Sequence, residues 1–263
     1  MNRLVVANPL ALIGRGTLEV CRTTGEVVLF GLVALWKGLR GPWYPRQVLR
    51  QMVEIGYFSL PVVGLTAIFT GMVLALQSYT GFSRFEAPNA IPTIVVLSMT
   101  RELGPVLAGL MVAGRVGAAM AAELGTMRVT EQIDALQTLA TDPLRYLVFP
   151  RLLAAMLMLP ALVLVADVIG VMGGYLVSIY KLGFGPVEYL NRTFEHLETQ
   201  DVVSGLVKAA CFGFIVALMG CHQGYHSRGG AQGVGLATTR AVVSASILIL
   251  TADYMLTEIF FSR

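Results

Sequence analysis

The sequence predicts an all-α integral membrane protein, and its composition is the first reason. Of the 263 residues, 56% are hydrophobic and only 13% are charged, with a mean hydropathy of +0.71. A soluble domain carries about 25% charged residues, so this chain has too little polar surface to face water on all sides. The composition excludes a soluble enzyme, a disordered chain and a secreted disulfide scaffold. The net charge of +3 is too small to indicate nucleic-acid binding.

The N-terminal region, residues 1–54, is predicted to form an interfacial helix rather than a crossing. Its uncharged run, Val27–Trp36, is much shorter than the roughly 20 apolar residues that a transmembrane helix needs. Charged residues before this run recur every three or four positions. They therefore share one face of a helix, as in helices that lie on a membrane surface. These residues are Arg15, Glu19, Arg22 and Glu26.

Five long runs with few or no charges are predicted to be transmembrane helices. Because backbone groups find no water in lipid, helices are the only structure that fits runs of this length. The runs are Ile55–Leu76, Ile91–Ala113, Leu152–Tyr180, Val202–Cys221 and Ala241–Phe261. The chain is interpreted as one membrane domain, residues 1–263, with the interfacial region followed by a five-helix region at 55–261.

The predicted orientation follows from Lys and Arg, which accumulate in cytoplasmic loops. Most of the 19 Lys and Arg residues lie in the N-terminal region, at 115–151 and at 222–240, whereas the alternate loops hold few. The N-terminus is therefore expected in the cytoplasm and the C-terminus on the outer side. Glycines at 229–235 indicate a loop within the segment 222–240.

The sequence shows no site of its own for ATP or a metal ion. The phosphate-binding motif G-x-x-x-x-G-K-[ST] is absent, because none of the lysines, Lys37, Lys181 and Lys208, follows a glycine. His222 and His226 have a spacing that a metal site permits, but no second group of ligands accompanies them. No catalytic residue, cofactor or metal is therefore assigned to this chain.

The most informative stretch begins with Arg101, Glu102 and Pro105 inside the second predicted span. A charge at membrane depth costs at least ~2.5–3.5 kcal/mol, so it normally faces a cavity or a partner. Pro105 has no N–H and clashes with the Arg101 carbonyl, so the helix is expected to be weakened where the charges lie. Two interpretations stand. One is a polar substrate path at a broken helix, which we favour, and the other is an Arg–Glu pair that only fixes helix packing.

A short amphipathic helix is predicted at Thr130–Leu139, in the cytoplasmic connection between the second and third spans. Ile133, Leu136 and Ala140 fall on one face, which leaves polar side chains available to a soluble partner. The alternative is a solvated connector. The candidate docking residues are Thr130, Glu131, Gln132, Asp134 and Leu136.

The chain resembles a known family over nearly its whole length, and most strongly in its central region. The segments that carry the resemblance are RELGPVLAGLMVAGRVGAAMAAELGTMRVTEQIDAL, DPLRYLVFPR, GMVLALQ and LATTRAVV. They resemble the MlaE, or YrbE, family, the permease subunit of Mce-associated lipid ABC transporters. The resemblance implies a non-catalytic phospholipid permease of the bacterial inner membrane that contributes to outer-membrane lipid asymmetry.

The resemblance also implies partners and site residues. The permease would form a homodimer with two cytoplasmic ATPase subunits, which bind ATP and Mg²⁺. A ring of membrane-anchored Mce-domain proteins would lie on the periplasmic side, and a STAS-domain protein often joins the complex in Gram-negative bacteria. The family's coupling helix corresponds to the region Thr130–Leu139, and its lipid cavity lies at the dimer interface. The implied substrate-binding residues are Arg101, Glu102, Lys208, Arg240 and Asp253.

Two other functions fit the sequence. An ion- or proton-coupled secondary transporter would use Asp167, Lys208 and Asp253 as a relay of buried titratable groups. Against it, no inverted repeat is evident and the cytoplasmic helix would have no role. A non-transporting scaffold would need the buried charges only for assembly. Co-purification with an ATPase separates the secondary transporter from the lipid permease, and lipid-transport assays on charge variants separate the scaffold from it.

Overall fold

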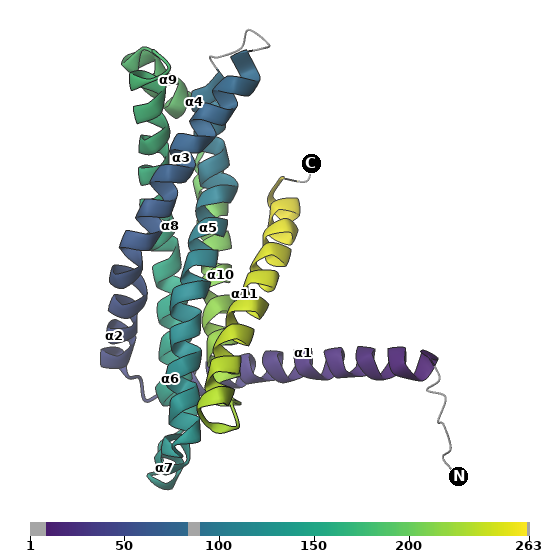
Figure 1. Cartoon of the computed structure of the whole chain (residues 1–263). Helices are drawn as coiled ribbons and strands as arrows, with labels where there is room; N and C mark the ends of the chain where they lie inside the picture. The colour runs from purple at the N-terminus through teal and green to yellow at the C-terminus, as the bar shows by residue number, and fades with distance from the viewer. Residues whose placement is uncertain (1–8, 84–89, 262–263) are drawn as a thin grey trace.

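The molecule is a bundle of long helices that run between its two ends (Figure 1). The computed structural model describes residues 9–83 and 90–261, and every regular element in these ranges is helical. Within them, five helical stretches are long and apolar enough to cross a membrane. They are Pro45–Phe82, Ile91–Val129, Leu144–Tyr180, Thr199–Tyr225 and Gly230–Phe261. The predicted all-α class with five spans is confirmed, although each stretch extends beyond the apolar run that indicated it.

Several of these stretches are composite. The first span comprises α2 (Pro45–Gly56), the 3₁₀ turn η1 (Tyr57–Ser59) and α3 (Leu60–Phe82). The second comprises α4 (Ile91–Ser98), η4 (Met99–Leu103), α5 (Gly104–Val112), η5 (Ala113–Gly117) and α6 (Ala118–Val129). The third comprises η6 (Leu144–Val148) and α8 (Phe149–Tyr180), and the last two are α10 (Thr199–Tyr225) and α11 (Gly230–Phe261). The elements η4, η5 and η6 are π-helical turns.

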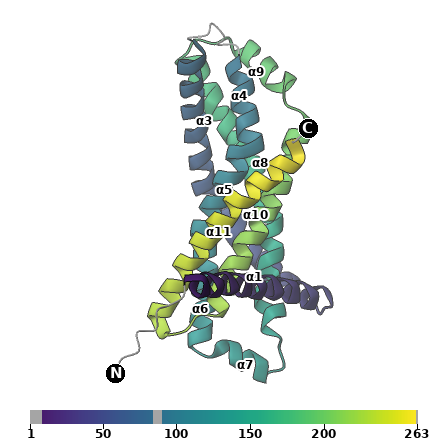
Figure 2. The ribbon, with the colours of Figure 1, turned by 90° about the vertical axis from the view of Figure 1, so that its right-hand side faces the viewer.

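The helix α1 (Pro9–Leu39) runs across the end of the bundle where the short helix α7 (Gln132–Thr138) lies, and α9 (Pro186–Glu195) lies at the opposite end (Figures 1 and 2). In the described part of the chain, α1 is not among the stretches that could cross a membrane, in agreement with the predicted interfacial helix. The Phe30 ring of α1 packs edge-on against the His222 ring of α10, which fixes α1 to the bundle. Residues 1–8 of the predicted interfacial region lie outside the described residues.

The connection between α10 and α11 corrects one expectation. The segment 222–240 is mostly helical rather than a loop, because α10 continues to Tyr225 and α11 already begins at Gly230. At the turn, Gly229 and Gly230 have φ values of 91° and 68°, which glycine adopts without a steric penalty. The later glycines belong to the first turns of α11. Glycine content alone therefore misplaced the start of the last span.

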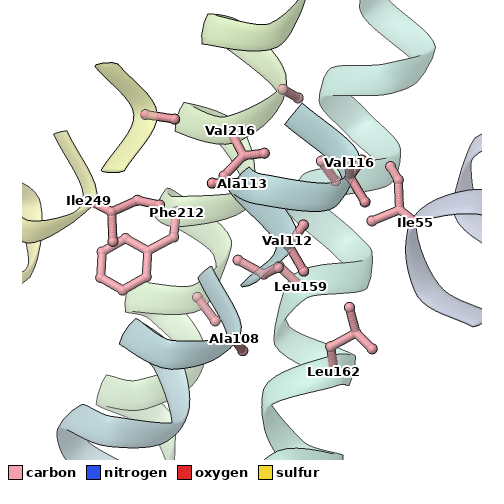
Figure 3. Close-up of a cluster of buried hydrophobic side chains, with 14 of the residues drawn as sticks. Ile55, Ala108, Val112, Ala113, Val116, Leu159, Leu162, Phe212, Val216 and Ile249 are labelled. Carbon is pink, nitrogen blue, oxygen red and sulfur yellow. The ribbon is translucent and has the colours of Figure 1, made fainter. Parts of the chain in front are cut away.

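The core consists of small and branched side chains from several spans (Figure 3). Helices inside a membrane associate through close packing rather than through the hydrophobic effect, so small residues concentrate where backbones meet. One such approach joins α3 and α8, where a Cβ added to Gly71 would lie 1.8 Å from the Gly170 carbonyl oxygen. The buried core residues include Ala108, Val112, Ala113, Leu159, Phe212 and Val216.

Candidate functional site

A network of charged side chains lies where the second, fourth and fifth spans meet. Its centre is Lys208 on α10, whose side chain is 0% exposed. Lys208 Nζ donates hydrogen bonds to Glu102 Oε2 (2.8 Å), the Arg101 carbonyl oxygen (3.0 Å) and Thr257 Oγ1 (2.7 Å). Asp253 Oδ1 lies 3.1 Å from the same nitrogen. Because an ammonium has three donor hydrogens, the acceptors of the protein itself satisfy Lys208.

The local sequence of the second span explains why a cation is held at this point. Pro105 has no N–H to offer the Arg101 carbonyl, so that oxygen loses its usual helical partner. The π turn η4 lies directly before this proline, and Lys208 Nζ bonds to the oxygen instead. The predicted weakening of the helix beside Arg101 and Glu102 is therefore confirmed. Lys208 satisfies a backbone group as well as neutralising carboxylate charge.

Exposure differs sharply among the members of the network. The Glu102 side chain is 37% exposed and that of Asp253 is 19% exposed, whereas Lys208 is sealed between the helices. The Thr257 hydroxyl lies 3.1 Å from Glu102 Oε1, which helps to fix the carboxyl group in place. A carboxyl group, and not the ammonium, is therefore the part of the network that another molecule could reach.

Arg101 pairs with the start of α10 and not with its neighbour Glu102. Both Nε and Nη2 of Arg101 lie 2.7 Å from Asp201 Oδ1, and the guanidinium lies over the Phe261 ring at 4.6 Å. Asp201 is 1% exposed, and its Oδ2 accepts a hydrogen bond from the Glu198 N–H at 3.1 Å. The Arg–Glu packing pair that the sequence allowed is thus not formed. Each of the two charges instead joins the second span to other spans.

Two of the residues that the sequence singled out lie away from this network. Arg240 is exposed on α11, roughly 20 Å from Asp253 along the helix axis at ~1.5 Å per residue. Among the described residues, none forms an ion pair with its guanidinium. Asp167 on α8 is 8% exposed and faces Gly104, where an added Cβ would lie 1.9 Å from Asp167 Oδ1. That oxygen has no hydrogen-bond partner among the described residues, and no ion pair there joins Asp167 to Lys208.

The sequence did not single out two residues that complete the site. Asp201 lies in the first turn of α10, where acidic residues commonly stabilise the start of a helix. Because that common role explains its position, the sequence gives no sign of its ion pair with Arg101. Thr257 follows Asp253 by one helical turn, which places both on the same face of α11. That spacing is a signal from which Thr257 could have been found.

The helix α7, for which the sequence predicted a docking role, is shorter than predicted. Thr130 follows the last residue of α6, and Glu131 has a left-handed backbone with φ 61°, so helical structure resumes only at Gln132. Ile133 is 0% exposed and anchors the helix, while Leu136 packs partly against the core. The exposed polar side chains of this region are those of Thr130, Glu131, Gln132, Asp134, Gln137 and Thr138.

Ion pairs connect α7 to α6, and the residues after α7 to α1. Arg128 Nη1 donates a hydrogen bond to Asp134 Oδ1 at 2.7 Å, which joins the end of α6 to α7. Lys37 Nζ of α1 lies 2.6 Å from Asp142 Oδ2, just beyond α7. Burial raises the pKa of the Asp142 carboxyl, but the hydrogen bond and charge of Lys37 outweigh it, so the pKa lies below its usual value. The connection after α7 is therefore tied directly to the interfacial helix.

These features define an integral membrane protein of the permease class, with charges between its spans and the short helix α7 at one end. A family model described as "Permease MlaE" matches residues 48–259. The chain belongs to the MlaE permease family.

Three relatives from distant organisms support this assignment. A "Probable ABC transporter permease protein" from Rickettsia bellii is 59% identical over 249 residues, which cover 95% of this chain and 96% of the relative. "Protein TRIGALACTOSYLDIACYLGLYCEROL 1, chloroplastic" from Arabidopsis thaliana is 38% identical, covering 97% of this chain and 70% of the relative. The "Intermembrane phospholipid transport system permease protein MlaE" from Haemophilus influenzae is 34% identical, covering 98% and 99%.

Proposed function

We propose that this chain is the membrane-spanning subunit of an ATP-driven transporter that moves phospholipid. The name of the Haemophilus relative refers to intermembrane phospholipid transport, and that of the Rickettsia relative to an ABC transporter permease. The chain has no phosphate-binding motif, so ATP and Mg²⁺ would be bound by a separate ATPase subunit in the cytoplasm. The permease itself would supply the lipid path and no catalytic residue.

The observation that carries the proposal is the charged network between the spans. Charged groups at membrane depth are costly, and they are characteristic of substrate paths. Because Lys208 is sealed and Glu102 is partly open, Lys208 would position Glu102 rather than touch the lipid. Glu102 would meet the ammonium of a zwitterionic headgroup, and Arg101 would meet its phosphate. Asp253 would balance the Lys208 charge when the path is empty.

Arg240 would act at a different depth from the rest of the proposed site. It is exposed and lies nearer than Asp253 to the α7 end of α11. A guanidinium without an ion-pair partner is a good ligand for a lipid phosphate. Arg240 would therefore contact a headgroup that lies closer to that end of the bundle.

The proposed assembly places the α7 end in the cytoplasm. Glu131, Gln132 and Asp134 would meet an ATPase subunit there, together with Thr130 and Leu136 at the edges of the contact. Two copies of the chain would form the complex with two ATPases in the bacterial inner membrane, and a STAS-domain protein would accompany them. The C-terminus and α9 would face a periplasmic ring of membrane-anchored Mce-domain proteins. Such a complex would maintain outer-membrane lipid asymmetry.

The decisive experiment is ATP-dependent transfer of a fluorescent phospholipid by the purified complex in proteoliposomes. Glu102→Gln is expected to assemble with the ATPase but to reduce transfer about tenfold, the effect of losing about 1.4 kcal/mol. Glu19→Gln, an exposed change on α1, is the matched control and should leave transfer unchanged. Normal transfer by an assembled Glu102→Gln complex would contradict the proposed path. Transfer driven by an ion gradient without ATP would support a secondary transporter instead.

A further inference from the structure

A second polar feature lies at the connection between α1 and α2, apart from the charged network. A cavity of about 640 Å³ opens here, large enough for a small polar ligand. We call it the elbow groove. It is lined by Trp43, Tyr44, Pro45, Arg46, Gln47, Arg50 and Tyr146.

The elbow groove carries positive charge that no described residue neutralises. Arg46 and Arg50 are one turn apart on α2, so their side chains share a face, and both are exposed. Glu54 is one further turn along, but its carboxylate lies 3.4 Å from Arg115 Nη2. In the part of the chain that the structure describes, no ion pair is made by Arg46 or Arg50. The sequence from residue 27 to residue 53 contains no acidic residue.

Aromatic side chains form the walls of the elbow groove and are held in place. The Tyr44 and Tyr146 rings meet edge-on at 5.1 Å, and Gln47 Nε2 donates a hydrogen bond to the Tyr146 hydroxyl at 2.7 Å. The Trp43 ring packs against Phe149 at 6.2 Å, yet Trp43 remains 59% exposed. Tryptophan and tyrosine favour the headgroup level of a membrane.

The position of the groove agrees with that level. Figure 1 shows the lower end of α2 at the same end of the bundle as α1, the helix that lies across it. A ligand here would therefore meet two guanidinium groups and aromatic rings at the membrane surface. Guanidinium groups bind phosphate oxygens through paired hydrogen bonds, and this preference identifies the ligand chemistry.

We propose that the elbow groove binds the phosphate of an anionic phospholipid from the leaflet in which α1 lies. Arg46 and Arg50 hold the phosphate, and Trp43 covers the glycerol region. The lipid is a resident of the groove and not the transported substrate, because the groove lies on the first span whereas the charged network joins the second, fourth and fifth. The inference therefore requires a membrane protein but not the proposed transport activity.

The chain provides its own reporter for a binding experiment, since its two tryptophans are Trp36 and Trp43. Trp36 stacks with Arg40 at 3.7 Å, and Trp43 lines the groove. In full-length Trp36→Phe protein in neutral detergent, titration with dihexanoyl phosphatidylglycerol should change the Trp43 fluorescence. Dihexanoyl phosphatidylcholine and inorganic phosphate are the comparison probes, and they should give much weaker responses.

The double variant Arg46→Gln/Arg50→Gln should bind the anionic lipid about 30-fold more weakly, from about 1 kcal/mol for each lost cation. Arg15→Gln/Arg228→Gln removes two exposed charges elsewhere and should bind like the parent protein. Equal affinity of the groove variant and the parent protein would overturn the proposal. Equal binding of phosphatidylcholine, or of inorganic phosphate alone, would also overturn it. Loss of ATPase pull-down with unchanged lipid binding would identify the groove as a protein contact instead.

Discussion

Replacing Lys208 with methionine is expected to destabilise the bundle by about 3 kcal/mol. The side chain is 0% exposed and makes three hydrogen bonds, each of which contributes about 1 kcal/mol. Its loss also leaves Glu102 and Asp253 without their cation, and removing one member of a buried pair costs ~3–5 kcal/mol. Because Glu102 is 37% exposed, water offsets part of this cost, so the lower end of that range is expected.

Equilibrium unfolding in mixed micelles measures this loss directly. Lys181→Met is the matched control, because Lys181 is exposed at the far end of α8, and it should leave the unfolding midpoint unchanged. Adding Glu102→Gln and Asp253→Asn to Lys208→Met should restore most of the stability, since the uncompensated carboxylates are then gone. If Lys208→Met unfolds at the same midpoint as Lys181→Met, the network does not stabilise the bundle and the reasoning fails.

Three further outcomes follow from other contacts. Gly71→Val should lower the thermal midpoint strongly in a detergent melting assay, because even a Cβ at this position would lie 1.8 Å from the backbone of α8; a melt like that of the parent protein would contradict this close approach. Asp134→Arg should abolish ATPase pull-down, and adding Arg128→Asp should restore the internal ion pair but not the pull-down; recovery in the double variant would mean that only α7 geometry matters. The pKa of Asp142 lies below its ordinary value of 3.8, so its contact with Lys37 stabilises the α1 attachment above that pH and is lost as the pH falls through the lowered pKa. The protection of the end of α1 against hydrogen exchange, relative to the intrinsic rate at each pH, should therefore fall in acid, and Asp142→Asn should remove this dependence; a variant that still shows it would rule out Asp142 as the cause.

The spans and the broken helix were predictable because their causes lie in neighbouring residues. Apolar runs indicate where a helix crosses the membrane, whatever the rest of the chain does. Pro105 acts on the carbonyl of Arg101 within the same helix, so its effect is visible in the sequence and appears as η4. The spacing from Arg15 to Glu26 likewise describes one helix face and needs no partner.

The partners within the charged network were not predictable in the same way. Asp201 and Lys208 lie seven residues apart on α10, and how α10 is placed against the second span decides that Asp201 meets Arg101 while Lys208 meets Glu102. No local pattern in the sequence specifies that placement. The start of α7 was also missed, because Glu131 adopts a left-handed backbone that usually favours glycine or asparagine.

The two π turns of the second span have a mechanical consequence. η4 and η5 lie immediately before and after the nine-residue helix α5. Each of these π turns contains one residue more than an α-helical turn would. Moving the surplus residue from one turn to the other would rotate α5 by about 100° while both ends of the span stayed in place. The middle segment of the second span, α5, therefore has a π turn at each end that would allow it to rotate. Because α5 contacts α8, α10 and α11 directly, such a rotation would change its packing against all three helices.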